Sequence, residues 1–271
     1  MSRISQTFEA LAAENKKALI PYLVAGDPDR GTTVALMHAL VAAGANVIEL
    51  GIPFSDPSSD GAIIQLGGQR SLAQGTTLRD VLSMVEEFRG TDKETPIVLM
   101  GYLNPIEIMG YEAFAERAEE VGVDGVLIVD MPAYESEGLL ASVRPRGIDT
   151  IFLLAPTTTE AREASICSNS TGYLYYVSLK GVTGAAITDQ AEIDARIKHL
   201  KGVTSLPVVV GFGIKDADSA KAMASISDGV IVGSALVDRI SKLKAGQQYS
   251  EAELAQTVGL IADMRESINN I

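Results

Sequence analysis

The sequence has few residues of several kinds, and each shortage excludes a class of protein. Cys167 is the only cysteine among 271 residues, so no internal disulfide can form, and we expect a small, partly buried side chain. Lys and Arg number 22 against 35 Asp and Glu, which leaves a net charge of −13. Nucleic acids and anionic membranes attract basic surfaces, so neither is expected as the main partner. A small phosphate group remains allowed, because backbone N–H groups bind anions whatever the net charge.

Long apolar runs and histidines are also scarce. No apolar run approaches the roughly 20 residues of a membrane-spanning helix. The first residues contain Glu9 and Glu14 and no continuous apolar core, unlike a signal peptide. We therefore expect a soluble, cytoplasmic protein. The two histidines, His38 and His199, lie in stretches with helical spacing, and no set of metal ligands is evident, so no metal site is predicted.

The most frequent pattern is a short apolar run, a turn rich in Gly, Pro and Asp, and then an amphipathic stretch. Each run is almost continuously apolar, which is typical of parallel strands buried on both faces. Stretches between the runs carry apolar residues at helical spacing. The predicted strands, some with their exit loops, are Ala18–Pro28, Asn46–Gly51, Pro96–Tyr102, Gly125–Asp130, Thr150–Pro156, Tyr173–Ser178, Pro207–Gly213 and Gly229–Ser234.

Eight such units without a linker predict one domain over residues 1–271, a single (β/α)₈ TIM barrel. Two helices are extra. Ile4, Phe8 and Leu11 mark a leading helix that could cover the bottom of the barrel, and Ser250 with Glu253 predicts the capping box of a final helix. A doubly wound open sheet is the main alternative. It more often has fewer strands, and no G-x-G-x-x-G follows the first strand here.

Glycine-rich segments follow the last three predicted strands, at the barrel end where active sites of this fold lie. They are "KGVTG" at 180–184, "GFG" at 211–213 and "GSA" at 233–235, and a short extra helix follows the last one. Glycine lets the backbone approach a ligand closely, and a helix N-terminus favours an anion. Three such segments at successive strand ends predict a phosphate site.

Carboxylates gather at the second strand, in "ELGIPFSDPSSDG". Glu49 lies near the end of this strand, where an inward side chain would point into the pocket, and Asp60 lies in the following loop. Asp56 is a candidate turn former, since Ser-Asp-Pro is a turn signal. Two carboxylates near one pocket can divide acid and base roles when their surroundings separate their pKa values. A Schiff base on Lys180 is conceivable, but this lysine lies in the loop beyond its strand.

These residues resemble the α subunit of tryptophan synthase over almost the whole chain. The second-strand segment is similar to the family's specific E-L-G-x-P-F-S-D-P-x-A-D-G-P signature. Other matching segments occur in the family's order: "GDP" at 26–28, "MGYLNP" at 100–105, "GVDGVLIVDMP" at 122–132, "GVTG" at 181–184 and "GFGI" at 211–214. The resemblance implies a carbon–carbon lyase of tryptophan biosynthesis that cleaves indole-3-glycerol phosphate into indole and glyceraldehyde 3-phosphate.

The resemblance also implies roles for individual residues. Glu49 would be the principal acid/base, Asp60 would accept a hydrogen bond from the indole N–H, and Tyr175 would lie beside the same atoms. Substrate-binding residues would be Tyr22, Met100, Leu127, Thr183, Gly184, Phe212, Gly213, Gly233 and Ser234. This subunit would need no cofactor. Its partner would be the β subunit, which uses pyridoxal phosphate, in an α₂β₂ tetramer. Contact with the partner is expected at Asp56, Pro57 and Asn104.

The chain departs from the family pattern within and after the second-strand loop. Ser58 and Ser59 replace an apolar residue and alanine, Ala62 replaces proline, and Gly67–Gly68 stands where helix-compatible residues are usual. Glycine in a helix costs about 1 kcal/mol relative to alanine, so we expect a looser loop.

Two other functions remain open at this point. One is another phosphosugar barrel, such as an isomerase, although those place an acid or cysteine at the end of the first strand, where this chain has Tyr22. The other is a partner that activates the β subunit without turnover of its own. Glu49, Asp60 and Tyr175 argue against it, because an activator alone would not need them.

Overall fold

The strands form one parallel sheet in the computed structural model, which describes residues 1–178, 190–211 and 213–271. The sheet has nine strands in the order β5-β4-β3-β2-β1-β9-β8-β7-β6. They are β1 (Ala18–Val24), β2 (Ile48–Gly51), β3 (Ile97–Gly101), β4 (Gly125–Ile128), β5 (Asp149–Thr150), β6 (Leu153–Leu154), β7 (Leu174–Val177), β8 (Val208–Gly211) and β9 (Gly229–Val232). Each predicted strand is therefore present, and the TIM barrel is confirmed.

The fifth predicted strand differs in detail, because it is divided into β5 and β6. β5 pairs with β4, whereas β6 pairs with β7. The change of neighbour takes place at Ile151, whose N–H bonds to Val126, and at Phe152, whose carbonyl accepts the Tyr175 N–H. The two ends of the sheet order are thus consecutive in the chain, and the sheet closes into a barrel there.

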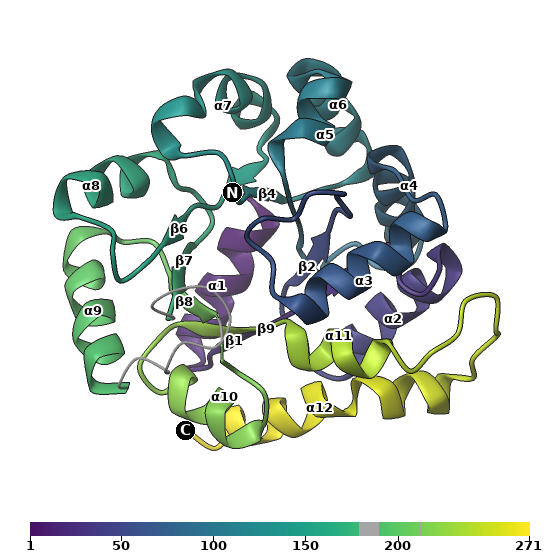
Figure 1. Ribbon diagram of the computed structural model, residues 1–271. Coiled ribbons are helices and arrows are strands. Elements are labelled where there is room, and N and C mark those ends of the chain that lie inside the picture. The colour runs from purple at the N-terminus through teal and green to yellow at the C-terminus, as the bar shows by residue number, and fades with distance from the viewer. Residues whose placement is uncertain (179–189, 212) are drawn as a thin grey trace.

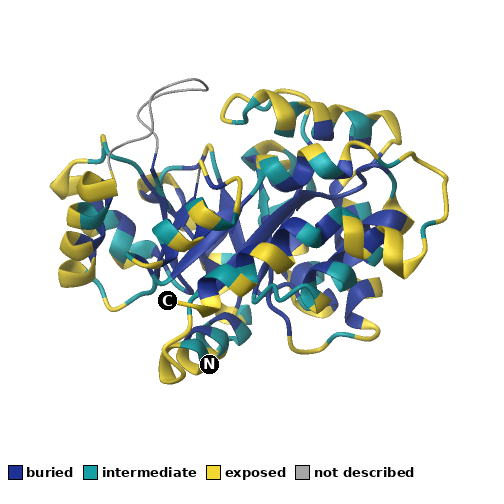
Figure 2. Ribbon diagram, turned by 90° about the horizontal axis from the view of Figure 1, so that it is seen from below, coloured by how far each residue is buried: buried dark blue, intermediate teal, exposed yellow. Residues whose placement is uncertain are grey.

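Helices form a ring around the strands, and Figure 1 shows this ring from one end of the barrel. Their inward faces are buried and their outward faces exposed, while the strands are mostly buried (Figure 2). The helices that the structure describes are α1 (Arg3–Ala13), α2 (Arg30–Ala42), α3 (Ala62–Ala73), α4 (Leu78–Arg89), α5 (Leu103–Met109), α6 (Tyr111–Val121), α7 (Glu137–Val143), α8 (Glu160–Asn169), α9 (Gln190–Val203), α10 (Ala217–Ala224), α11 (Ser234–Ile240) and α12 (Glu251–Asn269), with short 3₁₀ turns η1 (Ala133–Glu135) and η2 (Arg144–Arg146).

The leading helix α1 covers the bottom of the barrel, as predicted. Ile4 and Phe8 are buried in the same cluster as the side chains that fill the barrel interior. The Phe8 ring lies against Tyr173, with 5.7 Å between the ring centroids. Polar contacts hold the start of the helix, since the Ser2 hydroxyl donates to Asp149 at 2.5 Å and Arg3 pairs with Asp124 at 2.6 Å.

Local signals start and stop several helices. Ser250 and Glu253 form the predicted capping box of α12, and Thr77 forms another with Asp80 at the start of α4. After α2, Gly44 has a φ of +98°, a backbone angle that residues with a side chain rarely adopt. These ends depend on neighbouring residues only, and this explains why the sequence predicts them.

The glycine pair lies inside a continuous helix, α3. Gly67 is buried and Gly68 is half-buried. A Cβ at position 67 would lie 3.0 Å from Val237, whereas one at position 68 would meet nothing within 4 Å. Gly67 thus has a packing reason that the sequence did not reveal. The expected looseness of the preceding loop stays a prediction.

Candidate active site

Glu49 points into the barrel from β2, two residues before this strand ends. The neighbouring Ile48 and Leu50 belong to the layer between strands and helices, and Val47 belongs to the barrel interior. Side chains alternate along a strand, so Glu49 is on the inner side with Val47. It is 0% exposed. A charged group with no access to water must find partners or change its proton affinity.

Only one of the two carboxylate oxygens of Glu49 has a partner among the described residues. The Tyr173 hydroxyl donates to Oε1 at 2.6 Å, and Oε2 is buried without a hydrogen bond. Burial raises the pKa of Glu49 to about 7, and the Tyr173 hydrogen bond opposes this rise in part. A group with such a pKa can give and take a proton at neutral pH, as a general acid/base must.

Tyr175 lies close to Glu49, but Tyr173 makes the hydrogen bond. Burial raises the pKa of the Tyr175 phenol well above its usual value, and the charge of Glu49 adds to the rise. The sequence singled out Tyr175 and missed Tyr173 as the partner of Glu49. The available signal was their spacing, because residues two apart on a strand share one face.

Asp60 is half-buried at the end of the loop that follows β2. Burial raises its pKa to about 6, and a hydrogen bond with the Tyr102 side chain opposes the rise. The Tyr102 hydroxyl also accepts the Ser59 N–H at 3.0 Å, and its ring stacks on Phe54 with 5.1 Å between centroids. Tyr102 at the end of β3 therefore ties this loop to the barrel, a role that the sequence did not suggest.

Tyr22 lies close to both Glu49 and Asp60, so these two carboxylates belong to one site. Burial raises the pKa of its phenol well above the usual value, and the charges of Asp60 and Glu49 both contribute. Met100 packs against the Tyr22 side chain's cluster and against the barrel interior, where Leu127 is fully buried. The predicted acid/base residues and the predicted ring-flanking residues thus lie around the same end of the barrel.

The predicted phosphate residues are described only in part. Gly233 immediately precedes α11, and Ser234 is its exposed first residue. Gly213 is exposed and has φ +76. Thr183, Gly184 and Phe212 lie outside the described residues, as does Lys180.

The predicted partner-contact residues lie at the outer rim of the same end. Asp56 and Asn104 are exposed, and Pro57 is half-buried. The Asp56 carbonyl accepts the Ser58 N–H at 2.8 Å, so Asp56 forms a turn.

The two histidines contact neither Glu49 nor Asp60 in the residues that the structure describes. His38 on α2 stacks on Phe88 with 4.6 Å between centroids, and His199 on α9 pairs with Glu163 at 3.0 Å. Within the described ranges, no group of three or more His, Cys, Asp or Glu side chains could hold a metal ion. Nor does any helix in these ranges combine the length and apolarity needed to cross a membrane.

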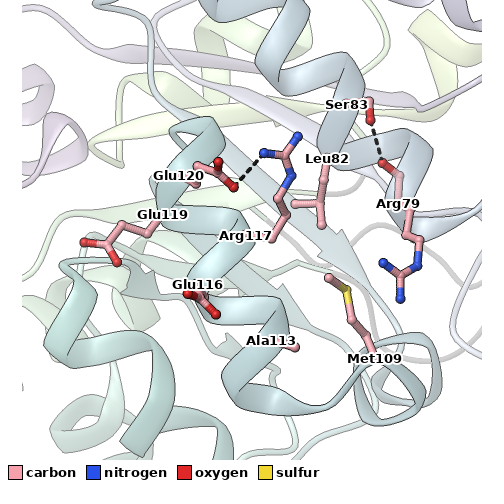
Figure 3. Close-up of a pocket in the computed structure, with 9 residues that line it drawn as sticks. All are labelled: Arg79, Leu82, Ser83, Met109, Ala113, Glu116, Arg117, Glu119 and Glu120. Atoms are coloured by element: carbon pink, nitrogen blue, oxygen red, sulfur yellow. Dashed lines mark hydrogen bonds and ion pairs between the residues drawn. The ribbon is translucent and has the colours of Figure 1, made fainter.

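A separate cavity of about 590 Å³ lies on the outer wall of the barrel. Figure 3 shows its lining side chains, which come from α4, α5 and α6 and include the ion pair between Arg117 and Glu120. No strand residue lines it. This cavity is therefore distinct from the site around Glu49.

Comparisons with known proteins agree with this geometry. The family model described as "Tryptophan synthase alpha chain" matches residues 8–268. The tryptophan synthase alpha chain of Thioalkalivibrio sulfidiphilus is 54% identical over 99% of this chain and 100% of that protein. The one from Marinobacter nauticus is 52% identical over 100% of this chain and 99% of that protein.

Solved structures lead to the same family. The crystal structure of tryptophan synthase subunit alpha from Legionella pneumophila has a TM-score of 0.90 and 44% identity, with both chains covered to 100%. With its barrel, its buried acid and its similarity to these relatives along its whole length, the chain belongs to the tryptophan synthase alpha chain family.

Proposed function

We propose that Glu49 is the acid/base of the family's reaction, the cleavage of indole-3-glycerol phosphate into indole and glyceraldehyde 3-phosphate. One observation carries this proposal. Glu49 is fully buried, has a pKa of about 7, and keeps Oε2 without a partner among the described residues. A carboxyl group in this state can protonate a carbon atom that a solvated carboxylate would not.

The reaction then needs one proton added and one removed. Protonated Glu49 gives its proton to C3 of the indole ring, which makes the ring a leaving group. Loss of the proton from the adjacent glycerol hydroxyl forms the aldehyde, the bond from that carbon to C3 breaks, and the electron pair returns to the ring. Glu49, now ionised, is a candidate acceptor for the hydroxyl proton. Asp60 accepts a hydrogen bond from the indole N–H and stabilises the positive charge of the intermediate.

The remaining predicted residues hold the substrate. Tyr22, Met100 and Leu127 flank the ring, and Tyr175 lies beside the reacting atoms. Gly213, Gly233 and Ser234 bind the phosphate, together with Thr183, Gly184 and Phe212 of the undescribed segments. The position of Gly233 and Ser234 at the end of β9, on the same side as Glu49, supports this assignment.

A partner subunit is part of the proposal, because the family functions as one subunit of tryptophan synthase. The partner is the β subunit, which carries pyridoxal phosphate and forms an α₂β₂ tetramer; this chain binds no cofactor of its own. Two large side chains are exposed in the segments that follow β3 and β4: Ile108, on the same helix as Asn104, is 80% exposed, and Tyr134 is 71% exposed. Both follow neighbouring strands, β3 and β4, and exposed apolar groups of this kind favour a protein contact.

Indole release from purified protein tests the function. We expect the chain to release indole from indole-3-glycerol phosphate, and faster release when the β subunit is added. No release in either condition would overturn the lyase proposal. Equal rates and no co-elution with β on gel filtration would overturn the partner proposal alone.

Two further predictions remain for experiment. We propose that residues 1–271 act as one domain, which is supported by the single sheet that contains every described strand. We also propose a cytoplasmic location.

A further inference from the structure

We propose that Arg70 is a positioning residue that pairs with the buried Asp27 and thereby holds α3 over the phosphate end of the site. The inference rests on the proposed function, since it concerns how firmly the same site binds its phosphorylated substrate. Neither residue was assigned a role by the sequence beyond the position of Asp27 at the end of the first strand.

The Asp27–Arg70 pair is the first observation. Asp27 follows β1 and is 1% exposed. Arg70 Nε donates to Oδ1 and Arg70 Nη2 donates to Oδ2, each at 2.8 Å. Such a two-pronged pair fixes orientation as well as distance. The next residue adds a third bond, because the Ser71 hydroxyl donates to the Ala25 carbonyl at 2.5 Å. The C-terminal half of α3 is therefore held to the chain directly after β1.

Close packing at Gly67 is the second observation. A Cβ at this position would lie 3.0 Å from Val237 Cγ1 on α11, 3.2 Å from Val24 Cγ2 on β1 and 3.2 Å from Asp27 Oδ2. At these distances a methyl group would require α3 or its neighbours to give way by a few tenths of an ångström, which would loosen the contact of α3 with α11 and β1. Gly68, next in sequence, faces open space. The Asp27–Arg70 pair and Gly67 thus lie at the same contact, where α3 approaches β1 and α11.

The third observation connects this contact to the substrate site. Ile64 lies three residues before Gly67, on the same side of the helix. It packs in the cluster formed by Tyr22, Val24 and Val237, and its Cδ1 would be 3.9 Å from a Cβ on Gly233. Figure 1 shows α3 lying beside α11, the helix that begins directly after Gly233. Ile64 is therefore a wall of the site on the phosphate side.

The geometry separates binding from chemistry. Within the part of the chain that the structure describes, Arg70 bonds to Asp27 and not to Glu49, whose position depends on β2 and on the Tyr173 hydroxyl. Loss of the pair would shift Ile64 and the phosphate end while leaving the acid in place. A loss of binding that is equal in ground and transition states raises KM and leaves kcat unchanged.

Steady-state kinetics of the full chain test the proposal. We expect Arg70→Gln to raise KM for indole-3-glycerol phosphate about tenfold and to change kcat less than about twofold. Arg70→Lys keeps the charge but loses the two-pronged geometry of the guanidinium group, so its KM should lie between those of wild type and Arg70→Gln. Gly67→Ala should raise KM without any change of charge, and Gly68→Ala is its matched control with unchanged KM.

A second control separates positioning from general stability. Arg89 forms a comparable buried pair with Asp124 at 2.6 Å, at the opposite end of the barrel. Arg89→Gln should lower the melting temperature and leave KM unchanged. If Arg70→Gln fails to fold because Asp27 is left charged and unpaired, the neutral double variant Asp27→Asn/Arg70→Gln and Gly67→Ala replace it. The expected KM rise is the same.

The possible outcomes are distinct. An unchanged KM in the folded Arg70 variants and in Gly67→Ala would overturn the inference, as would an equal rise in Arg89→Gln. A wild-type protein that releases no indole would refute the proposed function instead. In that case calorimetric binding of glyceraldehyde 3-phosphate decides: weaker binding to Gly67→Ala than to Gly68→Ala supports the inference, and equal binding overturns it.

Discussion

Two buried carboxylates at opposite ends of the barrel differ in the partners that surround them. Asp124 lies directly before β4, at the bottom, and is 4% exposed; Glu49 lies near the mouth and is 0% exposed. Asp124 receives Arg3 on Oδ1, and Arg89 and the Ile97 N–H on Oδ2. Glu49 receives one neutral hydroxyl, from Tyr173.

The difference shows how this fold separates stability from chemistry. Two guanidinium groups at the bottom compensate the charge of Asp124, so this carboxylate serves to tie α1, α4 and the strands together. At the mouth no cation among the described residues pairs with Glu49, so the loss of hydration is expressed as a raised proton affinity. A buried carboxylate with full partners is structural, and one with a missing partner is a candidate acid.

The largest effect is expected at the uncompensated carboxylate. Glu49→Gln keeps the size of the side chain but cannot transfer the proton, so kcat should fall by about 10³-fold or more. The fold should persist. Indole release measures the loss, and circular dichroism checks the structure. Full activity in this variant would end the acid/base assignment.

At the bottom of the barrel the expected effect is on stability. Arg89→Gln leaves Asp124 buried with one cation instead of two, and breaking such a pair costs about 3 kcal/mol or more. Urea unfolding measures this loss. The folded variant should retain the wild-type kcat, and a proportional loss of kcat would contradict the division between the two ends.

The pH dependence of stability gives a third comparison. The pKa of Glu49 is about 7 in the folded chain, against 4.5 as its ordinary value. A raised carboxyl pKa stabilises the folded state below pH 4.5, and this contribution is lost as the pH rises towards 7. This difference in pKa corresponds to about 3 kcal/mol. Relative to wild type, Glu49→Gln should gain about this much between pH 4.5 and 8. If the urea midpoints of wild type and Glu49→Gln differ by the same amount at every pH in that range, the raised pKa is contradicted.

The smallest effect concerns the one partner that Glu49 has. Removing the Tyr173 hydroxyl by Tyr173→Phe takes away a donor that favours the ionised carboxylate, so the pKa of Glu49 should rise further. Protonated Glu49 starts the reaction, and therefore the fall of kcat at high pH should move to higher pH. Tyr176→Phe is the matched control, because Tyr176 lies in β7, the strand that begins directly after Tyr173, and its side chain packs in the outer layer. If kcat falls at the same high pH in Tyr173→Phe and in Tyr176→Phe, the result would argue against the role of Tyr173.

Much of the fold could be predicted because its signals are local. The apolar runs placed the strands, and Ser250 with Glu253 placed the start of the final helix. The split of the fifth strand could not be predicted, since Ile151 and Phe152 bond to different neighbours. The packing reason for Gly67 could not be predicted either, because its close neighbours Val237 and Asp27 lie far away in the sequence.

The sequence by itself determined the succession of strands and helices, the plug made by Ile4 and Phe8, and the place of Glu49 near the end of a strand. Hydrophobic periodicity and helix caps depend on residues a few positions apart, so they can be recognised in the sequence alone. Only the tertiary structure decided that Tyr173, 124 residues away, holds one oxygen of Glu49 while the other remains without a partner in the described residues. The proton affinity of a buried group depends on what surrounds it in space, and that is decided when the barrel closes.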